Sequence, residues 1–211
     1  MTGSVSLSKV SLEKKGQSVS LAKRPSFGDV SVNLNWNQGE AKPTGFLRSL
    51  LGGGSGKSAI DLDLGCLYEM HDGSKGVVQA LGNAFGDLRE PPYVQLSGDD
   101  RSGANAEGET LRINGAKWQE IKRLLIYTFI YEGVPNWDAT DGVVLVKVPS
   151  EAPIEVRLTG GSNTAGMCGI AMLENVGGEI RVTRLVDYVA GHQALDKAHG
   201  WNMQWKTGSK D

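Results

Sequence analysis

Hydrophobic and polar residues alternate along much of this chain. In VSVNLNWN, for example, Val30, Val32, Leu34 and Trp36 fall on one face of an extended strand. The same strand-like patterns recur in VSLSKVSLEK, SVSLAK, AIDLDLGCLYEM, VVQAL, RLLIYTFIYEG, GVVLVKVP, IEVRLTGG, MCGIAMLENVGGEIRVTRLVDYVA and GWNMQWK. Helical patterns are weaker, and the two best are GAKWQEIKRLL, from Gly115, and GHQALDKAHG. Eight or more strands with so few helices predict a mainly β protein, a β-sandwich of two antiparallel sheets with one or two short helices.

One stretch, QGEAKPTGFLRSLLGGGSGKS, breaks the alternation. A chain of 211 residues with 39% hydrophobic residues is long enough for one core. We therefore expect residues 1–211 to form a single domain with a flexible Gly/Ser-rich insertion at about 37–58. GGGSGKS resembles a phosphate-binding loop, but Leu51 stands where that motif needs glycine, and a strand pattern follows instead of a helix. A flexible loop is the favoured interpretation, and nucleotide binding through Lys57 is kept as an alternative.

Composition and motifs narrow the function classes. A net charge of -2 and a pI near 6.0 give no electrostatic argument for nucleic-acid binding. The N-terminus lacks a signal-peptide pattern and the apolar runs are too short for membrane helices, so we expect a cytoplasmic protein. Cys66 and Cys168 are expected to be free, buried thiols. No nucleophile or zinc motif is present, and His71, His192 and His199 are interpreted as core or surface residues, so no enzyme activity is expected.

The positions of the carboxylates raise the possibility of a binding site. Asp61 and Asp63 are two residues apart in IDLDLG, so on a strand both project from one face while Leu62 and Leu64 face the core. Asp is disfavoured in strands, and two like charges on one face repel each other. The pattern fits either an exposed polar face near a strand end or a cation site that keeps both groups ionised.

A second acidic segment follows, GDDRSGANAEGETLRI. Gly98 and Gly103 permit backbone bends that bring carbonyl groups beside carboxylates. The carboxylates concerned are those of Asp99, Asp100, Glu107 and Glu109. Oxygen donors without His or thiolate favour Ca²⁺, with Mg²⁺ as second choice because it demands stricter geometry. The spacing does not fit an EF-hand. Glu132, at the end of another strand pattern, is a further candidate ligand, whereas DATDG reads as a turn.

Several motifs together resemble a known family. They are IDLDLGCLYEMHDGSKGVVQALG, GDDRSG, FIYEGVPNW, VVLVKVP and CGIAMLENVGGEIRVTRLVDYVAGHQALDKAHGWNMQWK. In this order they resemble the TerD-like tellurium-resistance and stress-response proteins, and within them the TerA type. The resemblance implies a bacterial, non-enzymatic, calcium-binding β-sandwich from an operon that confers resistance to tellurite and other insults. It also implies a scaffold or sensor role with other Ter-type proteins as partners, with the inner membrane reached through them. Neither nucleic acid nor a small-molecule substrate is expected.

The resemblance also assigns ligands. Asp61 and Asp63 match the family's Asp-x-Asp strand, and Glu132 stands near where the family has an Asp after a strand. Four loop residues match its Gly-Asp-Asp/Asn-x-Ser/Thr-Gly motif: Gly98, Asp99, Asp100 and Gly103. Glu107 and Glu109 fall in the second half of that loop, where NAEGE is shorter and less acidic than is typical. The shorter loop favours one calcium ion over two. A third hypothesis is an interaction module with a degenerate metal site.

Overall fold

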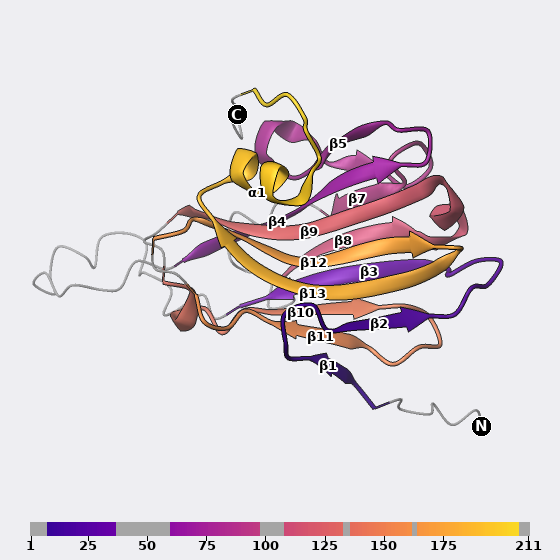
Figure 1. Ribbon diagram of the computed structural model, residues 1–211, viewed down its shortest axis with the longest axis horizontal. Helices are drawn as coiled ribbons and strands as arrows, with labels where there is room; N and C mark the ends of the chain where they lie inside the picture. Colours follow the sequence, from indigo (N-terminus) through magenta and orange to yellow (C-terminus); the bar gives the residue numbers. More distant parts are fainter. Residues whose placement is uncertain (1–7, 37–59, 98–107, 133–135, 162–163, 207–211) are drawn as a thin grey trace, which may run out of the picture.

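The computed structural model describes residues 8–36, 60–97, 108–132, 136–161 and 164–206. These residues form two β-sheets, so the predicted mainly β fold is confirmed (Figure 1). One sheet runs, in spatial order, β1 (Val10–Leu12), β11 (Ile154–Arg157), β10 (Val143–Lys147), β3 (Asp29–Asn35), β8 (Glu109–Asn114), β7 (Val94–Ser97) and β6 (Gly86–Asp87). The other runs β2 (Ser18–Leu21), β13 (Glu179–Val189), β12 (Met167–Val176), β9 (Ile121–Glu132), β4 (Asp61–Met70) and β5 (Lys75–Val78). The pairings between these strands are antiparallel, except that β1 pairs with β11 in parallel.

The two sheets enclose the main core. Val30, Val32 and Leu34 of β3 are fully buried, as their alternation predicts, and belong to the same cluster as Leu62 and Leu64 of β4. Cys66 and Cys168 are also in this cluster as free buried thiols, which confirms that prediction. Because alternate residues of each strand enter this core, the opposite faces of the sheets are left for other contacts.

A smaller apolar cluster covers the outer face of the six-stranded sheet. Its buried members are Leu67, Leu125, Tyr127, Phe129, Met167, Met172, Leu195 and Trp201. The last two come from the C-terminal cover, the name used here for helix α1 (His192–His199) and residues 201–206. In Figure 1 this cover lies over the ends of β4 and β9, so the six-stranded sheet is packed on both faces.

The helix predicted in GHQALDKAHG is α1, but the helix predicted in GAKWQEIKRLL is only partly correct. A 3₁₀ turn, η3 (Gly115–Glu120), forms there, and the chain then enters β9 at Ile121. β9 lies between β4 and β12 and pairs with both, so backbone pairing across the sheet overrides the local helical pattern. Two further 3₁₀ turns are η2 (Leu81–Asn83) and η4 (Trp137–Ala139).

The strand predicted in GWNMQWK is wrong. Residues 201–206 adopt no regular structure, because the Asp196 carboxylate of α1 accepts the backbone N–H groups of Asn202 at 2.7 Å and Met203 at 2.9 Å. The segment therefore folds back on α1 and packs outside the sheet, not in the core between the sheets. Trp201 is fully buried there, whereas Met203 and Trp205 are partly buried.

Two sequence predictions fall outside the described residues, the insertion at about 37–58 and the GGGSGKS segment within it. In the part of the chain that the structure describes, no helix is both long and apolar enough to cross a membrane.

Candidate metal centre

Strand β4 places two carboxylates of the candidate site on its outer face. Leu62 and Leu64 point into the core and are fully buried, so Asp61 and Asp63 project from the opposite face, as the alternation predicts. Asp61 is partly buried, and Asp63 is only 1% exposed. Asp63 therefore does not lie on an exposed polar face, whereas Asp61 remains partly accessible.

Two aromatic rings border Asp63. In the antiparallel pairing of β4 with β9, Phe129 is directly opposite Asp63, and Tyr127 is opposite Gly65. The Tyr127 ring lies where a side chain on Gly65 would be, since a Cβ atom there would be 2.6 Å from Tyr127 Cζ. Burial raises the pKa of the Tyr127 hydroxyl well above its usual value, and the nearby Cys66 and Asp63 groups raise it further. The hydroxyl is therefore protonated and donates to Gln79 Oε1 at 2.6 Å.

Glu109 approaches β4 from the other sheet. It is the first residue of β8 and is 4% exposed, on the same inward face as Leu111 and Ile113. Its Oε2 atom accepts a hydrogen bond of 2.6 Å from the backbone N–H of Leu64. The structure therefore brings three of the predicted residues to one end of β4: Asp61, Asp63 and Glu109.

Glu132 is placed next to this end by strand register. It pairs with Asp61, while Ile130 pairs with Leu62, so Tyr131 is an extra residue that forms a bulge in β9. The bulge is in β9, so the alternation of β4 is unbroken. The backbone of Glu132, a further candidate ligand in the sequence analysis, is thus beside Asp61.

The remaining predicted ligands lie outside the described residues. They are Gly98, Asp99, Asp100, Gly103 and Glu107. The segment that contains them leaves β7 at Ser97 and re-enters the described chain at Gly108, just before Glu109. The described chain therefore resumes one residue before Glu109, which contacts β4.

The donor chemistry of this end fits calcium. Asp61 and Asp63 offer carboxylate oxygens, the hard ligands that Ca²⁺ prefers. Within the described ranges, no three His, Cys, Asp or Glu side chains lie together as a metal-binding group. A shell of six to eight oxygens would thus need donors beyond Asp61 and Asp63.

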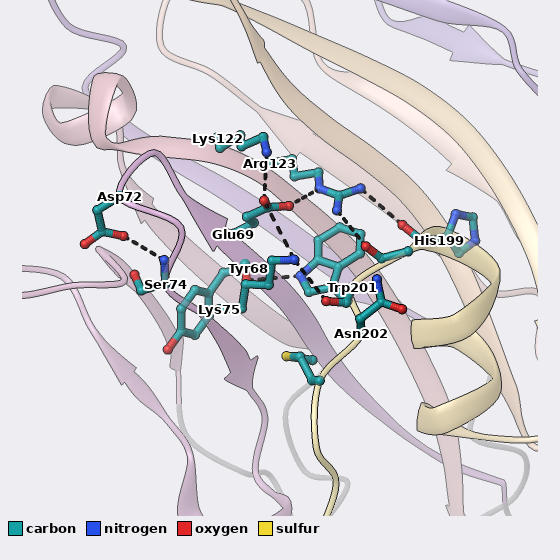
Figure 2. Close-up of polar contacts among 12 residues, drawn as sticks. Tyr68, Glu69, Asp72, Ser74, Lys75, Lys122, Arg123, His199, Trp201 and Asn202 are labelled. Atoms are coloured by element: carbon teal, nitrogen blue, oxygen red, sulfur yellow. Dashed lines mark hydrogen bonds and ion pairs between the residues drawn. The ribbon is translucent and has the colours of Figure 1, made fainter.

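A second polar cluster, at the other end of β4, was missed by sequence reasoning (Figure 2). Glu69 accepts hydrogen bonds from Lys122 at 2.7 Å and from Arg123 Nε at 2.6 Å, and Lys75 lies 3.9 Å away. Burial alone would raise the pKa of Glu69, but the hydrogen bonds and charges of Lys122 and Arg123 outweigh it and lower that pKa. In the sequence, the only sign of this cluster was that Glu69 lies an even number of residues from Asp61 and Asp63 and so shares their face of the strand.

This cluster holds the C-terminal cover. The Arg123 guanidinium lies 3.8 Å from the Trp201 ring centre and donates to the carbonyl groups of His199 and Gly200. The Trp201 indole in turn donates to the Tyr68 carbonyl at 3.1 Å. The Arg123 donors are thus engaged by protein groups, which identifies the cluster as a structural connection.

The three histidines lie in different surroundings. His71 is exposed, and His199 is partly buried near Asp187. His192 is partly buried, with its Nε2 atom 2.8 Å from Gln79 Oε1 and its ring against Tyr127, Phe129 and Trp205. Desolvation lowers the pKa of His192 to about 4, so its ring is neutral at physiological pH.

Comparison with known proteins supports the family resemblance. The chain is 54% identical over 208 residues to the tellurium resistance protein TerA of Alcaligenes sp., a match that covers 98% of this chain and 60% of that protein. The chain resembles TerA. This chain spans about 60% of the length of that relative. The resemblance predicted from the sequence motifs is confirmed.

The fold also has a counterpart among solved structures. The crystal structure of a homologue of the telluride resistance protein TerD from Streptomyces coelicolor A3(2) matches 80% of this chain and 94% of its own. The TM-score is 0.50 and the sequence identity 16%, so this match concerns the fold alone. No family model matches the chain.

Proposed function

We propose that the chain is a non-enzymatic, calcium-binding protein of a bacterial tellurite-resistance stress response. The observation that carries this proposal is the burial of the Asp63 carboxylate beside Asp61 on one strand face. Burying an ionised carboxylate has a large desolvation cost, which a bound divalent cation offsets. The 54% identity to a protein named for tellurium resistance supports the biological setting.

Calcium would be bound between β4 and the segment that links β7 to β8. Asp61 and Asp63 would supply carboxylate oxygens from the six-stranded sheet. Further oxygens would come from the ligands that the sequence analysis predicts in the linking segment, with Glu132 as another candidate. Because β7 and β8 belong to the seven-stranded sheet, the ion would connect the two sheets at one end of the sandwich.

Such a site suits a scaffold or sensor better than a catalyst. A cation that joins two sheets changes the rigidity of the surface around it, and partner proteins of the same stress system would recognise that surface. We propose that the protein acts in the cytoplasm, reaching the inner membrane through these partners, without a nucleic-acid or small-molecule ligand.

Calcium-dependent stability tests this proposal. Chelator-treated wild type and Asp63→Asn are each melted with and without calcium. Binding to the folded chain should stabilise the wild type by about 2.7 kcal/mol at a hundredfold excess over Kd. Asp63→Asn should lose this gain, while its stability without calcium stays unchanged or rises, because the substitution relieves repulsion with Asp61. Asp72→Asn, in an exposed turn, is the matched control and should keep the calcium response.

Other results would favour the alternatives. A wild type that shows no shift at millimolar calcium would indicate an interaction module with a degenerate metal site. A thermal shift with nucleotide that Lys57→Ala abolishes would instead indicate a nucleotide-binding module. Lower stability of calcium-free Asp63→Asn would show that Asp63 has a structural role.

A further inference from the structure

A hydrogen bond between the two sheets reaches the backbone at the candidate calcium site. Glu109 Oε2 of β8 accepts the Leu64 N–H of β4 at 2.6 Å, and both residues are buried. Leu64 lies directly after Asp63. The contact therefore acts on the peptide unit that joins Asp63 to the rest of β4.

This part of β4 needs such a partner. β9 pairs with β4 along its whole length, but β5, on the other side, pairs only with Cys66–Glu69. In the part of the sheet that the structure describes, the segment Asp61–Gly65 therefore has no strand on its second side. A buried N–H group without an acceptor is unfavourable, and the Glu109 carboxylate supplies the acceptor for Leu64 at this strand edge.

Glu109 approaches β4 from one direction, and Asp63 projects from β4 in another. Glu109 extends from the inward face of β8 and reaches β4 from inside the sandwich. Asp61 and Asp63 project from the outer face, where Phe129 and Tyr127 border Asp63. Glu109 thus contacts the β4 backbone through Oε2, whereas the two aspartates project from the outer face of the strand.

Contacts on both sides of Glu109 also fix its backbone. Gly108 has a φ of +70°, and a Cβ atom there would be 2.0 Å from the Leu34 carbonyl oxygen, so only glycine fits this approach to β3. The Asn33 side chain donates to the Glu109 carbonyl at 3.3 Å and to Thr110 Oγ1 at 3.0 Å. Three strands, β3, β8 and β4, are thereby linked through one residue.

We propose that Glu109 is a positioning residue of the calcium site: it fixes the β4 backbone that carries Asp61 and Asp63 and does not bind the ion itself. This inference rests on the proposed calcium-binding function. It gives Glu109 a role different from the ligand role that the sequence resemblance implies. It also explains why the acidic segment ends in a glutamate preceded by glycine.

Two substitutions at Glu109 separate the roles. Glu109→Gln keeps an acceptor oxygen for Leu64 but removes the charge that a ligand would supply. Glu109→Ala removes both, and Asp63→Asn serves as the reference for a lost ligand. Calcium affinity is measured by titration calorimetry, and exchange of the Leu64 amide proton is followed by NMR in calcium-free protein.

A positioning role predicts a distinct pattern. Glu109→Gln should bind calcium within about threefold of wild type, whereas Glu109→Ala should lose about 10–100-fold, as for other groups that orient a ligand. Asp63→Asn should lose at least as much as Glu109→Ala. The Leu64 amide should stay protected in Glu109→Gln and become exposed to exchange in Glu109→Ala.

The contrary outcomes are equally clear. If Glu109→Gln weakens binding as much as Asp63→Asn does, Glu109 is a ligand and the proposal is overturned while the calcium function stands. If wild type binds no calcium, the proposed function fails and the positioning role fails with it. The Leu64 exchange then shows separately whether the bridge exists. Should Glu109→Ala not fold, the Glu109→Gln comparison alone decides.

Discussion

At Gly65, the absence of a side chain makes room for a buried aromatic ring. A Cβ atom at this position would lie 2.6 Å from Tyr127 Cζ and 2.7 Å from its hydroxyl oxygen. The ring has little freedom to move, because it is fully buried and hydrogen-bonded to Gln79. Gly65 thus determines where Tyr127 lies, and Tyr127 borders the outer-face carboxylate Asp63.

Gly65→Ala should therefore be destabilising. Forcing the Tyr127 ring out of its position should cost roughly 1–3 kcal/mol of the free energy of unfolding, the usual range for overpacking a core. Urea unfolding measures the loss. Gly166→Ala is the control, because a Cβ atom there would meet nothing within 4 Å, so its stability should stay near that of wild type. Equal stability of both variants would show that the ring relocates freely.

At the scale of elements, β4 combines several tasks on one face. The residues on its outer face are, in order, Asp61, Asp63, Gly65, Leu67 and Glu69. The first two form the candidate calcium site, Gly65 receives Tyr127, Leu67 packs under the C-terminal cover, and Glu69 binds Arg123. One strand therefore connects the candidate metal centre to the C-terminal cover.

The sequence pattern correctly predicted the elements that follow from local strand geometry and that packing only stabilises further. The alternation of β3 and the shared face of Asp61 and Asp63 follow from strand geometry alone and were predicted correctly. The non-strand path of residues 201–206 depends on the Asp196 side chain, which no periodicity encodes. The contact of Glu109 with Leu64 joins residues 45 positions apart in different sheets, so sequence reasoning identified Glu109 but missed its partner.

Helix α1 supplies a pH-sensitive group to the cover. Desolvation lowers the pKa of His192 from 6.5 to about 4, so between these values the unfolded chain binds more protons than the folded one. The contribution of neutral His192 to the free energy of unfolding is largest above its unfolded pKa and declines as the pH falls toward 4.

His192→Gln should therefore weaken the pH dependence of stability. Between pH 7.5 and 5.0, the free energy of unfolding of wild type should fall by roughly 1–2 kcal/mol more than that of the variant. Urea titrations at the two pH values measure this difference. Substituting the exposed His71 by Gln is the control and should preserve the wild-type pH dependence. An unchanged dependence in His192→Gln would contradict the assignment.

At the scale of the whole molecule, the described chain forms three layers: the seven-stranded sheet, the six-stranded sheet and the C-terminal cover. The main core lies between the sheets and contains both cysteines, whereas the outer cluster lies between the six-stranded sheet and the cover. Both thiols are fully buried, and burial raises the pKa of Cys66 to about 12 and also raises that of Cys168, so we expect both to react slowly in the folded protein. The two thiols therefore report on the main core, whereas the amide protons of α1 report on the outer cluster.

Trp201→Ala should loosen the cover and leave the sandwich closed. Trp201 is fully buried and packs against Arg123, so its truncation should remove about 3–5 kcal/mol of the free energy that holds the cover in place. Amide exchange in α1 should accelerate, because this eight-residue helix has no side-chain hydrogen bond at its N-cap and depends on packing. Cys66 and Cys168 should stay as slow to react with a thiol reagent as in wild type, since they face the opposite side of the sheet.

Mass spectrometry follows the amide exchange of α1 and the thiol labelling in one sample, with substitution of the exposed Tyr131 by Ala as the control. Thiol labelling that accelerates in step with α1 exchange would instead mean that the three layers unfold together.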